Sequence, residues 1–356
     1  MLERPNIADS DLMACLQAAY ELPIATVEFL PLGADTNTAV FKAWGDEADD
    51  EASTYFVKLR SGPFDEMSIV VPSYLHDKHV EHLIAPLPTR TQRLWASLGD
   101  YKVALFPFVA GRDGYDVDLL DRHWVEMGQV LKAIHTMALP TTILERLQRE
   151  TYPANWREKV HMFQKMAADT PFADPIAAEL AAFLKDKAAI VMGLVQRAEQ
   201  LAAVLKQQPE PFVLCHGDLH AGNVLIDGEQ HLYIVDWDTL VLAPRERDLM
   251  FVGGGLYLNK RTPEQEEGLF YQGYGAVQAN PVALAYYRYE RIIQDIAEFC
   301  SELLLTDAGG EDRPNSLRLL RSQFRPDSVI AMAYRSESAL PQAYKTGDFA
   351  FQPSRL

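Results

Sequence analysis

The chain has 356 residues, of which 48% are hydrophobic and 23% charged, and its formal net charge is -17. This length predicts two lobes, and the composition is that of a globular protein with a sizeable core. A negative charge of this size disfavours binding to nucleic acid or to anionic membranes, and it would attract a cationic small-molecule substrate.

Cysteine usage and the N-terminal sequence predict a cytoplasmic protein. The three cysteines, Cys15, Cys215 and Cys300, are far apart, which indicates neither a disulfide framework nor a zinc site. The N-terminus has no signal-peptide pattern, and the longest apolar run, residues 103–110, is too short to cross a bilayer.

The first third of the chain predicts an antiparallel sheet with helices on it. Polar turn-forming and acidic residues separate its elements, and residues 45–53 are typical of an exposed hairpin tip. The expected elements are a helix over Asp9–Tyr20, strands over Thr26–Leu30, Ala39–Trp44 and Thr54–Leu59, a helix over Asp65–His79 interrupted by Pro72, and a strand from Tyr101 that ends at Pro107.

Helical spacing dominates the rest of the chain. Helices are expected over Val117–His135, Pro171–Lys206 and Thr262–Leu305, with short strands at Phe212–Cys215, Val224–Ile226 and Leu232–Val235. We therefore expect an α+β protein with an N-terminal lobe of residues 1–109 and a C-terminal lobe of residues 110–356.

The segment from Phe212 to Asp238 carries the strongest chemical signal. A strand leads into Asp218, and Asn223 follows five residues later; a hairpin then delivers Asp236 and Asp238. Phosphoryl transfer needs an oriented hydroxyl and neutralised phosphate charge. An aspartate base, with amide and carboxylate oxygens as Mg²⁺ ligands, would supply both. Each residue alone would be read as a turn former, but the combination favours catalysis by Asp218, with Asn223 and Asp236 binding metal.

These motifs resemble the aminoglycoside phosphotransferase and choline kinase superfamily. The pattern is His-Gly-Asp, then Asn five residues after the Asp, then Ile-Val-Asp-Trp-Asp at residues 234–238. The stretches GADTNT, YFVKL, YPANWRE, LAPRERDLMFVGGG and YYRYERIIQDIA are similar to the spectinomycin phosphotransferase branch, between about residues 33 and 297. The resemblance implies a bilobal protein-kinase-like fold, with a small antiparallel-sheet N-lobe and a larger, mainly helical C-lobe.

The resemblance also implies an ATP site. Lys58 takes the place of the lysine that contacts the α- and β-phosphates, and Glu66 is the candidate for its partner, although Glu66 could instead match a helix dipole. The nucleotide loop keeps only Gly33, so Thr36 and Asn37 are expected to help bind phosphate, unless the loop is an ordinary turn.

Two further regions have candidate roles, the second from the spacing of residues on one predicted helix. Phe106 and Phe108 mark the expected hinge, where adenine would lie, although a core strand would give the same residues. The acceptor is expected to meet Asp218 and Asp238, together with Asp295 and Glu298 from one helix. The alternative for Asp295 is an i,i+4 ion pair with Arg291.

Two other residues near the motif leave their roles open. His216 is expected to brace the catalytic loop. Asp248 could orient that loop or pair with Arg245 or Arg247.

The implied activity is direct in-line phosphoryl transfer from Mg²⁺-ATP to a hydroxyl of an aminocyclitol antibiotic, with spectinomycin as the first candidate. Two alternatives remain open from the sequence. One is a metabolic kinase acting on choline, homoserine or an amino sugar, and the other is a nucleotide-binding pseudokinase.

Overall fold

The computed structural model describes residues 4–33, 37–45, 53–208, 211–254, 261–306, 310–326 and 328–345. Its internal contacts divide the chain into two compact units, each built from separate segments. Unit 1 contains residues 1–118, 137–147 and 222–240, and unit 2 contains residues 119–136, 148–221 and 241–356. The division into lobes at residues 109 and 110 stays a prediction.

Unit 1 contains a five-stranded antiparallel sheet in the order β1-β2-β3-β5-β4. Its strands are β1 (Thr26–Leu30), β2 (Thr38–Trp44), β3 (Thr54–Arg60), β4 (Ala96–Leu98) and β5 (Tyr101–Pro107). The predicted strands are confirmed within one residue at each end, because β-branched and aromatic residues recur through them. The predicted hairpin tip lies largely at residues 46–52, outside the described part of the chain.

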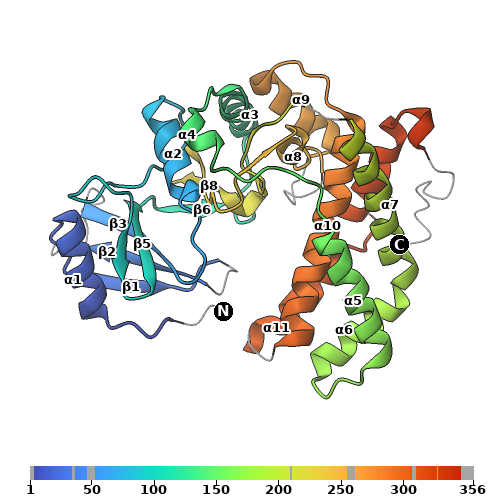
Figure 1. The fold of residues 1–356 in the computed structure, drawn as a ribbon, viewed down its shortest axis with the longest axis horizontal. Helices are drawn as coiled ribbons and strands as arrows, with labels where there is room; N and C mark the ends of the chain where they lie inside the picture. Colours follow the sequence, from blue (N-terminus) through green and yellow to red (C-terminus); the bar gives the residue numbers. More distant parts are fainter. Residues whose placement is uncertain are drawn as a thin grey trace. The chain divides into compact units, whose positions relative to one another are not determined.

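One face of this sheet is covered by helix α1 (Asp9–Tyr20), as Figure 1 shows. Leu12 and Leu16 join a buried cluster with Val57 and Leu105, and the Tyr20 hydroxyl donates to the Val103 carbonyl oxygen at 3.0 Å. Burial of apolar surface here stabilises the central strand β3, which carries Lys58.

The second sheet of unit 1 has three antiparallel strands in the order β6-β8-β9. They are β6 (Gly111–Asp113), β8 (Val224–Asp227) and β9 (Leu232–Ile234). The Asp227 carboxylate fixes the turn of the β8–β9 hairpin, because it accepts from the backbone N–H groups of Glu229 at 2.9 Å and His231 at 2.8 Å. Unit 1 also holds α2 (Met67–Asp77), with Pro72 inside it, and the single turn α4 (Thr141–Leu144).

Unit 2 is mainly helical. Its elements are α3 (Asp121–Thr136), α5 (Asn155–Asp169), α6 (Pro175–Asp186), α7 (Ala188–Gln207), α8 (Glu246–Leu249), α9 (Pro263–Tyr274), α10 (Pro281–Leu305), α11 (Arg313–Ser322) and α12 (Val329–Ser336), with the paired short strands β7 (Val213–Cys215) and β10 (Val241–Ala243).

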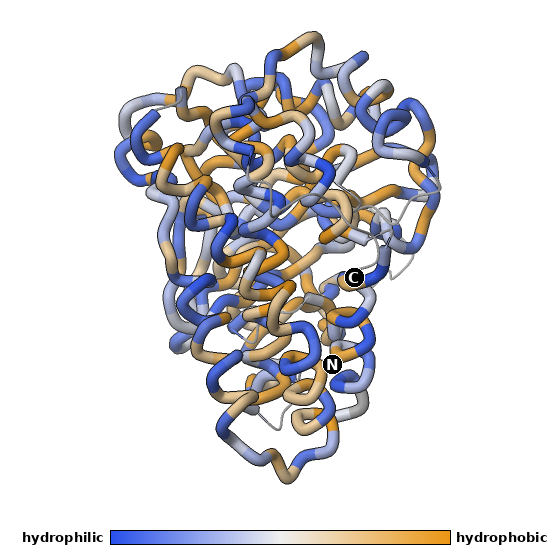
Figure 2. Tube along the Cα trace, turned by 90° about the vertical axis from the view of Figure 1, so that its right-hand side faces the viewer, coloured by the Kyte–Doolittle hydropathy of each residue, from blue (hydrophilic) through white to orange (hydrophobic). Residues whose placement is uncertain are grey.

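Helix α10 is the centre of unit 2. It contacts α5, α6, α7, α8, α11 and α12, and Figure 1 shows α5 and α7 running beside it. Its N-terminus is capped by Asn280, whose side chain accepts from the Val282 N–H at 2.9 Å. Hydrophobic and hydrophilic residues alternate along the helical turns in Figure 2, as amphipathic helices around a shared core require.

Helices α3 and α9 pack with their backbones unusually close. A Cβ atom on Gly128 of α3 would lie 2.2 Å from the Phe270 carbonyl oxygen, and one on Gly273 of α9 would lie 1.9 Å from that of Val125. Only glycine allows this approach from both sides. The crossing brings His135 of α3 next to Tyr274 of α9.

Helix α7 is the one helix in the described residues that is long and apolar enough to cross a membrane. Its buried residues include Val191, Leu194 and Leu201, and α7 packs against α10. A core helix passes the same test, so this finding is weak evidence for a membrane span.

Candidate active site

In unit 1, the side chain of Lys58 joins the two aspartates that follow β9. Its Nζ lies 3.0 Å from Asp236 Oδ1 and 2.9 Å from Asp238 Oδ2. The Lys58 side chain is 16% exposed, whereas that of Asp236 is 52% exposed. Burial lowers the pKa of Lys58, but the two carboxylates outweigh burial, so the pKa is raised. Lys58 therefore carries its charge across the physiological range.

A second cation, Arg60, extends this cluster. Its Nη1 lies 3.3 Å from Asp238 Oδ2 and donates to Thr38 Oγ1 at 2.8 Å. A pocket lies beside these groups, lined by Lys58, Arg60, Phe64, Asp65, Ser68, Ile69, Lys102, Ala104 and Asp238. Its three cations, Lys58, Arg60 and Lys102, outnumber its two carboxylates, Asp65 and Asp238, and this excess of positive charge suits an anionic group such as a phosphate.

The β8–β9 hairpin belongs to the three-stranded sheet of unit 1, and Asn223 directly precedes β8. Asn223 is buried, and its carbonyl oxygen accepts from the Val235 N–H at 3.0 Å, directly before Asp236. Asp236 has a left-handed backbone, with φ of 63°, which is uncommon for a residue other than glycine. Asn223, directly before β8, and Asp236, two residues after β9, thus carry an amide and a carboxylate oxygen at the same end of the hairpin, a donor set that suits Mg²⁺.

Lys58 and Glu66 do not pair with each other in this structure. Lys58 contacts Asp236 and Asp238, and the Glu66 carboxylate instead forms an ion pair with Arg146. The Glu66 carboxylate is drawn to the nearby arginine, so a Lys58–Glu66 contact would require both groups to exchange partners.

The remaining residues expected at the nucleotide site lie in turns and in β5. Gly33 has φ of 92°, the Asn37 carbonyl oxygen accepts from the Ser61 N–H at 2.9 Å, and Thr36 lies outside the described residues. Phe106 packs edge-on against Phe56, and the Phe108 N–H donates to the Thr54 carbonyl oxygen at 3.1 Å. A nucleotide base at this position would therefore have to use other backbone groups. The roles of these residues stay predictions.

In unit 2, the loop that carries Asp218 is held by a buried carboxylate. Asp248 of α8 is fully buried and accepts from the backbone N–H groups of His216 at 2.9 Å and Gly217 at 2.7 Å. Within the loop, the Asp218 N–H donates to His216 Nδ1 at 3.3 Å. Of the two roles that the sequence left open for Asp248, these contacts match the one that orients the loop.

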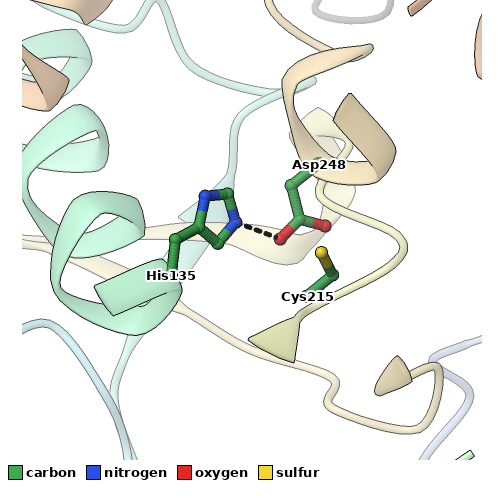
Figure 3. A group of neighbouring side chains, drawn as sticks. All are labelled: His135, Cys215 and Asp248. Atoms are coloured by element: carbon green, nitrogen blue, oxygen red, sulfur yellow. Dashed lines mark hydrogen bonds and ion pairs between the residues drawn. The ribbon is translucent and has the colours of Figure 1, made fainter. Parts of the chain in front are cut away.

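His135 completes this network, which Figure 3 shows with Cys215 beside it. His135 Nε2 donates to Asp248 Oδ2 at 3.0 Å, and its Nδ1 is 2.7 Å from the Tyr274 hydroxyl. Burial raises the pKa of Asp248, but the bonds from His135 and the loop N–H groups outweigh it and lower that pKa, so the carboxylate is ionised.

The same three groups have the geometry of a metal site, since their ligand atoms lie within 4.8 Å of one another. Burial raises the pKa of the Cys215 thiol well above its usual value, so the thiolate that metals prefer is disfavoured. His135 and Asp248 are already bonded to protein donors and acceptors. We therefore regard the group as a structural hydrogen-bond network.

The Asp218 carboxylate forms an ion pair with Arg291 of α10 through Oδ1 and Nη1. Arg291 Nε also lies 2.9 Å from Asp295 Oδ1, so the predicted i,i+4 pair is present. Asp295 Oδ2 accepts from Gln323 Nε2 at 3.0 Å. Burial raises the pKa of Asp295 to about 6, although Arg291 opposes the shift.

Glu298 and Asp238, the other expected substrate contacts, have different surroundings. Glu298 is exposed and accepts from Gln294 Nε2 at 2.9 Å. Asp238 belongs to unit 1, where Lys58 and Arg60 contact it. Their contacts with an acceptor stay predictions.

Arg60, Lys102 and the contact of Arg291 with Asp218 were not predicted from the sequence. The pairing of β3 with β5 sets Arg60 opposite Lys102, and both line the pocket beside Lys58. Their positions on the two predicted strands could have indicated this, because residues directly opposite each other in an antiparallel pair point to the same face of the sheet. No local signal links Arg291 to Asp218, which lies 73 residues earlier in the chain.

Comparisons with known proteins show the family of the chain. Residues 49–288 match the model of the phosphotransferase enzyme family. A solved structure of a spectinomycin phosphotransferase in complex with ADP and spectinomycin is 34% identical, covers 94% of this chain and 99% of its own, and has a TM-score of 0.85. An AMP-bound structure of that enzyme is 33% identical over 92% and 98% of the two chains, with a TM-score of 0.80.

More distant structures share the fold alone. An aminoglycoside phosphotransferase from Alicyclobacillus acidocaldarius is 15% identical over 95% of this chain and 97% of its own, with a TM-score of 0.57. A comparison with curated protein sequences gave no match. The antiparallel sheet and the helical part thus confirm the predicted protein-kinase-like fold.

Proposed function

The chain belongs to the phosphotransferase enzyme family and is an ATP-dependent phosphotransferase acting on a hydroxyl group, and we propose that its acceptor is an aminocyclitol, with spectinomycin as the first candidate. The observation that carries this proposal is the 34% identity, over nearly both whole chains, to an enzyme solved with ADP and spectinomycin. The net charge of -17 favours a cationic acceptor of this kind.

In the proposed mechanism Asp218 is the general base. Its carboxylate accepts the proton of the acceptor hydroxyl while the hydroxyl oxygen bonds to the γ-phosphorus and the bond to the β-phosphate oxygen breaks, releasing ADP. The buried bonds from His216 and Gly217 to Asp248 hold the loop that presents Asp218. No phosphoenzyme is formed.

Lys58 and its neighbours bind the phosphates of ATP. Lys58 is cationic, and Arg60 and Lys102 add positive charge to the pocket beside it. Asn223 and Asp236 would hold Mg²⁺, which neutralises phosphate charge when it is bound. Lys58 then exchanges its aspartate contacts for phosphate oxygens.

The test is phosphate transfer to a panel of acceptors, followed by mass spectrometry. The panel contains spectinomycin, other aminocyclitols, choline, homoserine and amino sugars, each incubated with the enzyme and Mg²⁺-ATP. We expect a mass increase of one phosphoryl group on spectinomycin at the highest kcat/KM. Reaction of homoserine or choline while spectinomycin stays unmodified would refute the proposed acceptor, and ATP binding without any transfer would indicate a pseudokinase.

A further inference from the structure

Arg291 occupies an unusual position for a cation in this enzyme. Its guanidinium contacts Asp218 through Nη1, and its Nε lies 2.9 Å from Asp295 Oδ1. The residue therefore bridges two carboxylates, one on the loop after β7 and the other one turn further along α10. The contact with Asp218 is a hydrogen bond from Nη1, whereas the contact with Asp295 is an ion pair without hydrogen-bond geometry at Nε, so the planar guanidinium directs the Asp218 carboxylate above all.

The surroundings restrict Arg291 on several sides. Its side chain is 13% exposed, and those of Asp218 and Asp295 are 20% and 12% exposed. The guanidinium carbon lies 5.9 Å from the centre of the Phe251 ring. Ion pairs at this depth are screened less by water than surface pairs, so breaking this one leaves a poorly solvated carboxylate.

The bridge continues to another helix end. Asp295 Oδ2 accepts from Gln323, which directly follows α11. The orientation of the Asp218 carboxylate is therefore linked through Arg291 and Asp295 to residues on two helices. The two aspartates and the arginine carry a net charge of -1 when both carboxylates are ionised, which leaves the cluster attractive to a cationic acceptor.

We infer that Arg291 is a positioning residue for the base, an inference that rests on the proposed function. By binding Oδ1 of Asp218, Arg291 fixes the rotation of the carboxylate, so that the proton of the acceptor hydroxyl is taken up by Oδ2, which lies 3.7 Å from His220 Nε2. In this role Arg291 acts through Asp218, whereas the cations proposed to bind the phosphates, Lys58 and Arg60, belong to unit 1. Loss of Arg291 should then affect the chemical step far more than the binding of nucleotide.

Three variants test this role. R291A removes the guanidinium. R291K keeps a positive charge that can form an ion pair with one of the two carboxylates. R321A is the matched control, because Arg321 also forms an ion pair with a carboxylate, that of Glu179, but at an exposed site on α11. The measurements are kcat and KM for spectinomycin and for Mg²⁺-ATP, and the rise in Tm caused by Mg²⁺-ATP.

We expect R291A to lose about 10- to 100-fold in kcat, the size of effect that misplacement of a reacting group produces. The KM for Mg²⁺-ATP and the nucleotide-induced rise in Tm should stay close to those of the wild type. R291K should recover part of kcat, and millimolar methylguanidinium should partly restore R291A. R321A should match the wild type in every measurement.

Two results would overturn the inference while the proposed function stands. One is an active wild type with an R291A variant within about twofold of it in kcat, too small a change for a positioning role. The other is an equal loss of kcat in R291A and R291K, with no recovery by methylguanidinium, while the nucleotide-induced rise in Tm stays that of the wild type; the guanidinium then does not position the base. A wild type that phosphorylates none of the acceptors would instead refute the proposed function, and this inference with it.

Discussion

Asp236 and Asp238 of unit 1 are contacted by the cationic side chains of Lys58 and Arg60, and Asp236 is half exposed. Asp248 of unit 2 is fully buried and accepts from backbone N–H groups and from His135. Side-chain cations can exchange partners when phosphate arrives, whereas backbone donors are fixed by the fold. If the proposed function holds, the cations of unit 1 would bind phosphate by exchanging partners, whereas the loop of unit 2 is held by fixed donors before any ligand binds.

The largest expected effect comes from D218N, which tests whether the preorganised loop carries the base. The variant should lower kcat by about 10²- to 10⁴-fold, because an amide cannot accept the hydroxyl proton. The rise in Tm with Mg²⁺-ATP should persist. D186N, at a surface carboxylate that is 72% exposed, is the control and should retain full activity. A D218N variant with near-normal kcat would mean that another group is the base.

The next effect tests how rigidly unit 2 is built. In G273A the new methyl group meets the Val125 carbonyl oxygen, so α3 and α9 must separate, at a cost of about 3 kcal/mol or more in the free energy of unfolding. G268A on the same helix is the control. Its methyl group meets nothing within 4 Å, so it should stabilise the protein by up to about 1 kcal/mol. Urea denaturation measures both; equal free energies would contradict the tight crossing.

A direct test of the comparison pairs D248N with D238N. In D248N the new amide nitrogen would face the N–H donors of the loop, so this variant should lose about 2 kcal/mol of unfolding free energy. D238N breaks contacts of a partly exposed carboxylate and should cost less than about 1 kcal/mol. Thermal and urea unfolding without nucleotide give both values. If the two losses are equal, the distinction between fixed and exchangeable carboxylates fails.

The smallest effect concerns pH and Glu266 of α9. Glu266 is buried and accepts from the Gly253 N–H at 3.0 Å; burial raises its pKa from 4.5 to about 7. The folded state therefore binds this proton more tightly, so its contribution is complete below pH 4.5 and is lost as the pH rises through about 7.

Between about pH 4.5 and 7, the wild type should show a fall in Tm of a few degrees that is absent in E266Q. E264Q is the control on the same helix. Glu264 lies in the first turn of α9, and its carboxylate accepts hydrogen bonds that lower its pKa. The Glu264 carboxylate therefore stays ionised throughout that range. An E266Q variant with the same pH dependence as the wild type would refute the assignment to Glu266.

The sequence predicted β1, β2, β3, β5, β8 and β9 of unit 1, and helical segments over α3, α6, α7, α9 and α10 of unit 2, because local periodicity decides them. It did not predict the short strands β4 and β6 or the helices α5, α8, α11 and α12. It also located the hairpin that carries Asp236, since its Asp-Gly turn is a short-range signal. Contacts between residues that are far apart in the sequence could not be predicted from it. Lys58 binds two aspartates instead of Glu66, and Arg291 reaches Asp218, because these pairings depend on how helices and strands pack.

The alternation of the chain between its two units has a consequence for synthesis on the ribosome. The carboxylates that pair with Lys58 lie in residues 222–240, and two segments of unit 2 are translated before them. A nascent chain ending at residue 118 has the five-stranded sheet but lacks strands β8 and β9. Unit 1 can therefore reach its native contacts only late in translation, and a fragment cut at the end of its first segment would leave Lys58 without either aspartate.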